Sequence, residues 1–385
     1  MNVAVIGAGL AGTSAAWRAA RAGHSVTIVH AGAGSSELYS GALDLAPWES
    51  APEHEHLPSA VLEFGKALGW ALSAEQSARV ATRAGLIRPA RGRDRSVLDL
   101  APLRGKRIGV ADLERDDWDA RSLAAGLGEC PWAAATRTRF EAVAVAGLRN
   151  GSERRISSYD FARLHDDPER AGFLAAELAR ANPGVEAWLV GPWLGVEQDL
   201  AARLTVELRL PVGETLSPPG GPAGARFELA RARLLGRLGI LARKARALRV
   251  SSRAVAWQID LDSSPSPLAA DAVVLALGGV AAGGVCLTGS PSGGPERGFE
   301  VSLEAPVELE LDGRAFESST LFGEDLAARG LELLERIGVS VDDQGAVRGV
   351  PGLFAAGDFV AGQPRTALSA VIQGLCAAES AVSRG

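Results

Sequence analysis

The sequence predicts an α/β fold, a parallel sheet with helices on it, that carries an inserted α+β domain. Three observations predict it: an apolar run followed by closely spaced glycines near the N-terminus, an apolar run ending in Gly-Asp near the C-terminus, and a length of 385 residues. One hydrophobic core stops growing at roughly 250–300 residues, so a chain of this length is expected to form two domains. With 47% hydrophobic and 22% charged residues, the composition is that of a folded globular protein.

Charge and cysteine content exclude several classes of protein. The 40 basic and 46 acidic side chains give a net charge of −6, which provides no basic surface for nucleic acid or an anionic membrane. Cys130, Cys286 and Cys376 lie too far apart for a disulfide framework, a zinc site or an iron–sulfur cluster, which favours a reducing, cytoplasmic compartment. The apolar stretch 269–287 contains Asp271 and pairs of glycines, so we expect a buried strand and a loop there and no membrane span.

The N-terminal residues predict a strand, a glycine turn, a helix and a second strand. Residues 3–6 form a continuous apolar run typical of a buried parallel strand, 7–12 have the G-x-G-x-x-G spacing, 10–22 favour a helix, and 25–29 favour a strand. The first glycine makes the tight turn, the second lets a pyrophosphate approach the backbone, and the third lets helix and strand pack closely. The helix N-terminus presents N–H groups to the phosphates. The dinucleotide-binding residues predicted here are Gly7, Gly9, Leu10, Ala11 and Gly12.

The second predicted strand ends without the carboxylate that normally binds the adenosine ribose. His30 stands in that place, and its imidazole can hydrogen-bond a hydroxyl only singly; Glu37, further along the chain, is the alternative. No arginine or lysine is expected to lie nearby and bind a 2′-phosphate, which disfavours NADP.

The C-terminal region predicts a further strand, turn and helix. Residues 352–358 read Gly-Leu-Phe-Ala-Ala-Gly-Asp, 366–382 favour a helix with small residues at close spacing, and 271–279 form an apolar strand that opens into glycines. This pattern resembles the strand–Gly-Asp–helix element of flavoproteins of the glutathione-reductase and fumarate-reductase type. There the Asp binds the ribityl chain or the pyrophosphate, and the helix dipole faces the flavin pyrimidine, which disfavours a nicotinamide dehydrogenase. The resemblance adds five cofactor-binding residues: Gly278, Gly279, Gly357, Asp358 and Thr366.

These segments predict a discontinuous, Rossmann-like nucleotide-binding domain. It is expected to contain residues 1–50, 225–290 and 340–385, and the inserted substrate or cap domain is expected to contain 51–224 together with 291–339.

The insertion carries no strong catalytic motif. Its helices are predicted at 60–72, 74–84 and 170–181, and the prolines and glycines of 216–225 predict a loop at the domain junction. A G-x-S-x-G nucleophile elbow is absent from the sequence, which disfavours a serine hydrolase. The alternating Glu and His residues of 53–56 indicate solvated charge, so no metal is expected.

The order of the motifs resembles the smaller, FMN-linked flavoprotein subunit of the anaerobic glycerol-3-phosphate dehydrogenase. That family has a Ser-Gly-x-x-Asp-Leu element after the second strand, and 40–45 read Ser-Gly-Ala-Leu-Asp-Leu. Its proline-rich junction before Gly and Arg is matched by 216–226, and its Val-Leu-Ala-x-Gly-Gly strand by 274–279. Its last segments are matched by 338–342 and 352–357, whereas the match is loose over residues 51–215. The resemblance adds Ser40 and Gly41 to the cofactor-binding residues. If the flavin is FMN, it has no adenosine ribose, so His30 in place of a carboxylate does not conflict with the family.

The resemblance implies a flavin-dependent dehydrogenase that oxidises sn-glycerol 3-phosphate to dihydroxyacetone phosphate in glycerol metabolism and anaerobic respiration. Electrons would pass to a quinone through partners, namely a second flavoprotein subunit and an iron–sulfur membrane-anchor subunit. The chain itself would be cytoplasmic and would reach the inner membrane only through that anchor.

Two features of the chemistry follow from these expectations. The family is described as using FMN, but the glycine turn suits a pyrophosphate, so FAD is predicted and FMN is the alternative. The substrate phosphate needs a cationic clamp, for which Arg365 is the first candidate and Arg226 the second. The sequence identifies no general base. The alternatives are therefore a non-catalytic flavin-bearing electron-transfer or assembly subunit, and an FAD oxidoreductase with another substrate.

Overall fold

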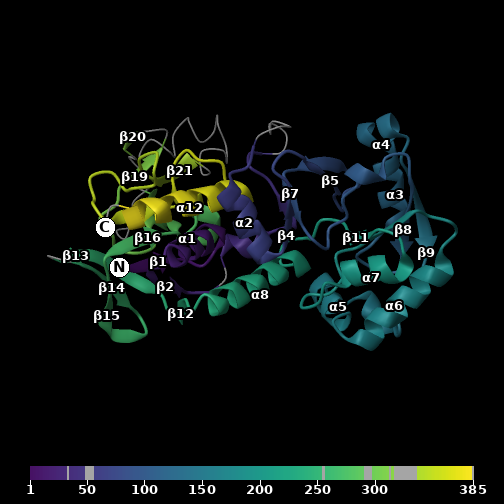
Figure 1. The fold of residues 1–385 in the computed structure, drawn as a ribbon, viewed down its shortest axis with the longest axis horizontal. Coiled ribbons are helices and arrows are strands. Elements are labelled where there is room, and N and C mark those ends of the chain that lie inside the picture. The colour runs from purple at the N-terminus through teal and green to yellow at the C-terminus, as the bar shows by residue number, and fades with distance from the viewer. Residues whose placement is uncertain are drawn as a thin grey trace. The chain divides into compact units, whose positions relative to one another are not determined.

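The computed structural model describes residues 1–32, 34–47, 56–253, 256–289, 297–311, 314–315 and 336–383. The chain divides into two compact units (Figure 1). Unit 1 contains Met1–Ser36, Leu45–Pro47 and Arg231–Gly385, and unit 2 contains Glu37–Asp44 and Trp48–Ala230.

The units have different bounds from the predicted domains. Residues 297–311 and 336–339, which the sequence placed in the inserted domain, belong to unit 1. The reason is strand pairing: β18 (Arg297–Val301) forms a hairpin with β17 (Val285–Gly289). In the same region Glu304 O accepts a hydrogen bond of 2.7 Å from Val250 N. Residues 53–55 of the charged stretch lie outside the described residues.

Unit 1 is built on a sheet of five parallel strands, which confirms the predicted fold class. In spatial order the strands are β12 (Leu241–Lys244), β2 (Ser25–His30), β1 (Asn2–Ile6), β16 (Ala272–Leu275) and β22 (Leu353–Ala355). All residues of β16 and β22, and all but the first of β1, are buried, as expected for a parallel sheet covered on both faces. All four residues of the edge strand β12 are exposed.

The two ends of the chain pack together in unit 1. Figure 1 shows α1 (Leu10–Arg21) beside α12 (Ala367–Ser383). Small residues allow the close approach: Ser14 Oγ lies 3.0 Å from Val371 O, and a Cβ on Gly374 would overlap both Ala11 O and Ser14 Oγ. The small residues predicted in the last helix therefore allow α12 to pack closely against α1.

The rest of unit 1 consists of antiparallel strands and short helical turns. Three strands form a meander that leads directly into β16 of the parallel sheet, and two further small sheets are formed between β16 and β22. The elements are β13 (Ala247–Arg253), β14 (Ala256–Leu261), β15 (Ser264–Ala270), η4 (Val280–Ala282), β19 (Leu309–Leu311), β20 (Arg314–Ala315), β21 (Ile337–Val339) and η5 (Gly357–Phe359). Buried side chains of the meander, such as Trp257 and Ile259, share one core with the parallel strands.

Unit 2 contains a second parallel sheet, which the sequence analysis did not predict. Its strands, in spatial order, are β11 (Val212–Glu214), β10 (Ala187–Val190), β8 (Arg107–Asp112) and β9 (Arg139–Ala144). Its helices are α2 (Ser59–Leu68), α3 (Ala120–Glu129), α4 (Pro131–Thr136), α5 (Ser158–Leu164), α6 (Pro168–Ala181) and α7 (Leu200–Leu208). Helix α8 (Pro222–Arg237) begins in unit 2 and ends in unit 1.

Short antiparallel strands complete unit 2. They form one sheet of three strands and one hairpin. The elements are η1 (Ser35–Leu38), which begins at the end of unit 1, β3 (Ala42–Leu43), β4 (Trp70–Leu72), β5 (Ala78–Ala81), β6 (Ile87–Ala90), β7 (Gly92–Asp94), η2 (Ala101–Leu103) and η3 (Gly151–Arg154). The predicted helix at 74–84 is therefore wrong, because β5 pairs with β6 across this stretch.

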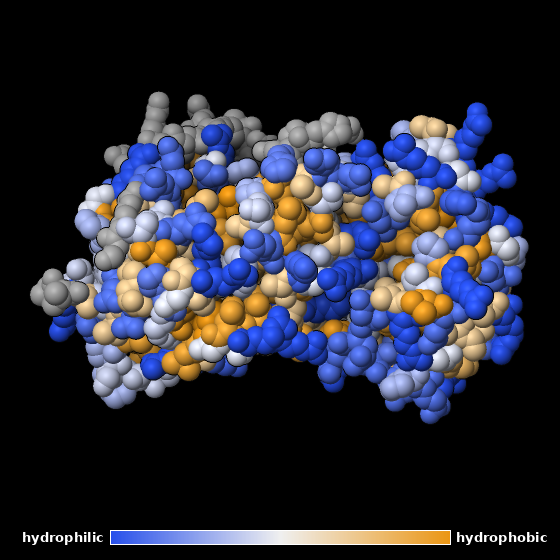
Figure 2. All heavy atoms as spheres, in the orientation of Figure 1, coloured by the Kyte–Doolittle hydropathy of each residue, from blue (hydrophilic) through white to orange (hydrophobic). Residues whose placement is uncertain are grey.

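The surface mixes polar and apolar residues. Figure 2 shows apolar stretches broken by hydrophilic side chains on the face in view. Large exposed apolar side chains include Val206, at 77% exposed, and Leu241, at 51%. Among the described residues, no helix combines the length and the apolar character that a membrane span requires.

A buried histidine makes the stability of unit 2 depend on pH. His165 lies in the core with Nδ1 2.9 Å from Trp193 O. Burial, together with the charges of Arg170 and Arg115, lowers its pKa from the ordinary 6.5 to about 4. Between these two values the unfolded chain binds a proton that the folded chain does not. The free energy of unfolding is therefore highest above pH 6.5 and is expected to fall by up to about 3 kcal/mol as pH drops towards 4.

Urea unfolding of the full chain at a series of pH values measures this effect. His165→Gln should remove that part of the pH dependence, because the variant has no imidazole to titrate. Parallel pH profiles for wild type and variant would contradict the assignment.

Candidate cofactor site

The parallel sheet of unit 1 has a switch point between β1 and β16. From β1 the chain continues to β2 and β12 on one side, whereas β16 and β22 lie on the other. Ligands of open parallel sheets bind beyond the carboxyl ends of the strands at such a point. The residues that follow these ends are Gly7, Ala276 and Ala356, Gly357 comes directly after Ala356, and the last residue of β2 is His30. The candidate site is therefore built from the two ends of the chain.

Two positions of the glycine turn after β1 have no room for a side chain. Gly7 has a φ of +110°, and a Cβ there would overlap Ala276 O, which follows β16. A Cβ on Gly12 would overlap Gly7 O. These contacts place the first turn of α1 directly on the switch point, as the motif predicts.

The N-terminus of α1 has N–H groups that can bind an anion. Gly9 is the N-cap and has no side chain to cap the helix, and the N–H groups of Ala11 and Gly12 have no acceptor within it. Leu10 N donates to Ser36 Oγ at 3.1 Å, and Ser36 is 8% exposed. The serine oxygen stands where a phosphate oxygen would accept the same hydrogen bond, and its O–H can donate to a phosphate. Ser36 could not be predicted from the sequence, because no fixed spacing links it to the glycines.

The C-terminal turn lies against this helix. Gly357, with a φ of +77°, is so close to α1 that a Cβ would lie 2.8 Å from Ala11 Cβ. Its N–H donates to Gln373 Oε1 at 3.0 Å, and the half-buried Asp358 follows it. On the other side, a Cβ on Gly279 would lie 2.7 Å from Asp358 O. The structure thus brings together the predicted residues of all three glycine-bearing turns.

Arg365 and Thr366 are bonded to protein carbonyls at the start of α12. Arg365 Nη1 donates to Asp358 O and Nη2 to Ile337 O, both at 2.7 Å. Thr366 Oγ1 donates to Leu45 O at 2.9 Å. A structural role for Arg365 follows, because its guanidinium ties η5 to β21. The predicted use of Arg365 as a phosphate clamp would require it to give up these contacts.

The remaining predicted residues lie in unit 2. Ser40 O accepts from Ser217 N at 2.8 Å and Gly41 O accepts from Asp94 N at 2.7 Å, so this segment is fixed by backbone bonds. Arg226 is the centre of a buried cluster in the same unit.

Arg226 neutralises two buried carboxylates. Its Nε lies 3.1 Å from Asp94 Oδ1 and its Nη2 lies 2.6 Å from Glu214 Oε2, and the Glu214 side chain is fully buried. Nη1 donates to Gly195 O at 2.8 Å. Burial raises the pKa of Glu214, and the Arg226 charge opposes that rise. The positive charge of Arg226 is therefore already matched by protein carboxylates, which favours a structural role over the predicted phosphate clamp.

The end of β2 is basic. Lys244 is the register partner of His30, Ala245 N donates to His30 O at 3.0 Å, and Arg231 Nη1 donates to Ala8 O at 2.8 Å. Burial lowers the pKa of His30, and the charges of Arg231 and Lys244 lower it further. The statement that no arginine or lysine is near this position is therefore wrong. Both cations come from residues far along the chain, on α8 and β12, which local sequence could not place.

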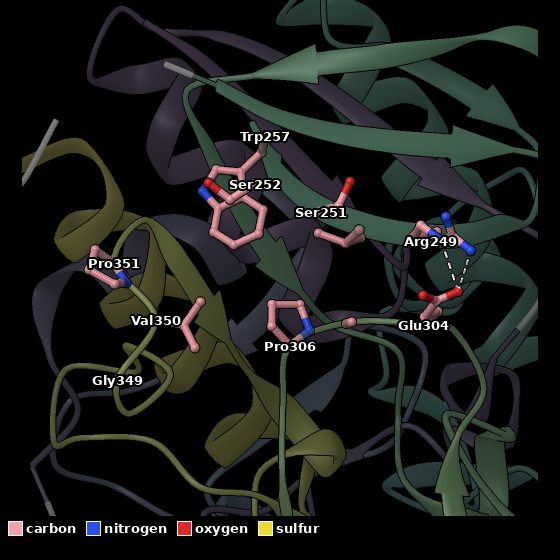
Figure 3. A pocket seen from close by; sticks show the side chains of 11 residues that line it. Arg249, Ser251, Ser252, Trp257, Glu304, Pro306, Gly349, Val350 and Pro351 are labelled. Carbon is pink, nitrogen blue, oxygen red and sulfur yellow. Dashed lines mark hydrogen bonds and ion pairs between the residues drawn. The ribbon is translucent and has the colours of Figure 1, made fainter. Parts of the chain in front are cut away.

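A groove of about 560 Å³ lies elsewhere in unit 1 (Figure 3). Its walls come from β13, β14 and the turns at 304–306 and 349–351, and Trp257, Pro306 and Val350 give it apolar surface. Its charged pair, Arg249 and Glu304, is bonded at 2.8 Å. The lining includes none of the predicted cofactor residues.

Comparisons with known proteins identify the nucleotide. Residues 2–86 match the family model described as "FAD binding domain", a span that contains β1, the glycine turn, α1 and β2. No curated protein matches the chain.

The solved structures that match this chain have low sequence identity to it and low TM-scores. Glycine oxidase from Geobacillus kaustophilus is 13% identical with a TM-score of 0.37, and the match covers 100% of this chain and 95% of that one. Iminodiacetate oxidase from Chelativorans sp. BNC1 is 15% identical with a TM-score of 0.32, covering 99% and 94%. Thioredoxin reductase from T. acidophilum is 15% identical with a TM-score of 0.25, covering 99% and 97%. Values this low carry no conclusion about substrate.

FAD is the cofactor of this domain, and the predicted preference for FAD over FMN is confirmed. The residues present fit it. The turn at Gly7 and Gly12 leaves no room for side chains, the first turn of α1 offers N–H groups beside the Ser36 hydroxyl, and Gly357 closes on Ala11. A pyrophosphate needs such a bare, electropositive helix N-terminus.

Proposed function

We propose that the chain is a flavin-dependent oxidoreductase that oxidises sn-glycerol 3-phosphate to dihydroxyacetone phosphate. One observation carries the oxidoreductase proposal: the matched FAD-binding segment has its glycine turn closed by the C-terminal Gly-Asp turn in one unit. The substrate is proposed from the order of the sequence motifs, which resembles that of the smaller flavoprotein subunit of the anaerobic glycerol-3-phosphate dehydrogenase.

In this proposal, different residues of the site hold different parts of the cofactor. The N–H groups of Ala11 and Gly12, with the Ser36 hydroxyl, would hold the pyrophosphate, and Asp358 would hold the adjoining part of the cofactor. When bound, FAD supplies an acceptor for the two electrons and one proton that leave the secondary alcohol as hydride. The hydroxyl proton leaves separately, and the electrons go to a quinone, giving the ketone and a quinol. A second flavoprotein subunit and an iron–sulfur anchor subunit are the proposed partners for that last transfer.

A second candidate is a flavin-bearing subunit that transfers electrons or supports assembly without binding the substrate. It is favoured by a specific observation: both arginines predicted to bind the substrate phosphate are held by protein groups. In that case the partner flavoprotein would bind the alcohol.

An anaerobic titration distinguishes these candidates. The full chain loaded with FAD is mixed with glycerol 3-phosphate, and the loss of visible flavin absorbance is followed; glycerol, which lacks the phosphate, is the control. Bleaching by glycerol 3-phosphate alone supports the first candidate, and bleaching only after the partner flavoprotein is added supports the second. Absence of bleaching with both proteins present would contradict glycerol 3-phosphate as the substrate. Failure to bind FAD would contradict the flavoprotein assignment itself.

A further inference from the structure

The residue at the end of β2 determines what the adenosine ribose of a bound nucleotide can carry. In dinucleotide-binding folds a carboxylate there hydrogen-bonds the ribose hydroxyls and repels a 2′-phosphate, whereas a nearby cation accepts that phosphate. This chain has His30 at the position and two cations around it, so its preference can be derived from their placement.

The first cation is fixed by strand pairing. Lys244 is opposite His30 in the parallel pair of β12 and β2, and the N–H of the next residue, Ala245, donates to His30 O at 3.0 Å. Paired residues of neighbouring parallel strands project from the same face of the sheet, and the strands are about 4.8 Å apart. Lys244 therefore starts beside His30 on the face that His30 uses.

The second cation comes from a helix. Arg231, on α8, donates from Nη1 to Ala8 O at 2.8 Å, within the glycine turn that would hold the cofactor. This bond holds the guanidinium charge between the turn and the end of β2. Arg231 and Lys244 thus flank His30 from two separate elements.

His30 itself contributes a hydrogen-bonding group and not a charge. Its Nδ1 is buried and has no hydrogen-bond partner among the described residues. Burial lowers its pKa, which favours the uncharged imidazole, and a backbone hydrogen bond with Gly32 partly opposes that fall. A neutral imidazole can bond a protonated or an ionised oxygen, so the positive potential of the neighbours decides which ligand is preferred.

We infer that the ribose end of this FAD site is an anion-binding subsite, which accepts an adenine nucleotide carrying a 2′-phosphate on its ribose. The inference depends on the FAD site lying at the glycine turn and goes beyond the proposed function. FAD itself has no such phosphate, so its ribose is held less firmly than it would be by a carboxylate. A 2′-phosphorylated adenine nucleotide competes with FAD for the same site.

Two probes that differ only in one phosphate test the inference. Adenosine 5′-monophosphate and adenosine 2′,5′-bisphosphate compete with FAD for the full chain, and FAD binding is followed by flavin fluorescence. The bisphosphate is expected to bind about tenfold more tightly than the monophosphate, and added salt should reduce this ratio. A third probe, adenosine 3′,5′-bisphosphate, shows whether the subsite selects a phosphate at the 2′-position.

Substitutions in unit 1 sharpen the test. His30→Glu should reverse the ratio, because the new carboxylate binds the free hydroxyls and repels the 2′-phosphate. Lys244→Gln should lower the ratio. Arg243→Gln is the matched control, since its neighbouring position on β12 projects from the opposite face and should leave the ratio unchanged.

The outcomes that overturn the inference are distinct from failure of the proposed function. Equal affinity for the two probes in a wild-type chain that binds FAD would overturn it. So would a preference for the monophosphate that is lost in Glu37→Gln, because Glu37 would then supply the ribose carboxylate. A chain that binds no FAD would instead contradict the flavoprotein assignment.

Discussion

Gly374→Ala is expected to destabilise unit 1 by about 3 kcal/mol, at the upper end of the range for overpacked cores. The added methyl group would overlap Ala11 O, a backbone atom, as well as Ser14 Oγ. The Ser14 hydroxyl can rotate away, but Ala11 O can move only if α1 and α12 separate. Since α1 carries the glycine turn, the same change should weaken FAD binding, which flavin fluorescence measures alongside urea unfolding.

A matched helical glycine provides the control. Gly236, on α8, has no heavy atom within 4 Å of its Cβ position. Gly236→Ala should therefore stabilise the chain by about 0.5–1 kcal/mol through the greater helix propensity of alanine. Unchanged unfolding and FAD affinity in Gly374→Ala would show that the two helices are not in close contact.

Arg226→Met is expected to destabilise unit 2 by about 3–5 kcal/mol, because it leaves two buried carboxylates without their counter-charge. Asp94 and Glu214 are 7% and 0% exposed, so solvent cannot take the place of the guanidinium. The loss should appear in urea unfolding of the full chain without any substrate present. Adding Glu214→Gln to this variant should restore part of it by removing one of the unpaired charges.

An exposed ion pair calibrates the result. Arg203 and Glu207 form an i, i+4 pair on α7, with side chains 42% and 39% exposed. Arg203→Met should change the free energy of unfolding by only about 0.5 kcal/mol. If Arg226→Met folds as stably as this control and loses only affinity for glycerol 3-phosphate, Arg226 would be a phosphate clamp after all and the structural role would fall.

Local sequence was enough to predict those elements whose own residues carry a clear pattern. The apolar run, glycine spacing and helical run at the N-terminus predicted β1, α1 and β2 with nearly their observed bounds, because a parallel strand and its crossover helix are read from neighbouring residues. The predicted helix at 170–181 also exists, as α6. The prediction that the two ends of the chain lie together was correct because each end has a buried strand followed by a glycine turn.

Local sequence failed where a residue's role is set by distant partners. The runs that form β8 and β10 contain about four apolar residues each, too few to separate a buried strand from a buried helix. The alanine-containing stretch 74–84 favours a helix by propensity, but pairing with β6 makes part of it a strand. The sequence gives no reason to treat one arginine or lysine differently from another. Only the contacts in the structure separate Arg226 and Arg365, which are bonded to protein groups, from Arg231 and Lys244, which lie near His30.

The seating of the last helix on the first has a consequence for how the protein is made. While the ribosome is still adding residues, α1 has already emerged but the surface that covers it, which begins at Ala367, has not. The small residues of α1 that α12 covers therefore stay uncovered until α12 itself has been made. A nascent chain that stops before Ala367 has no finished site for FAD.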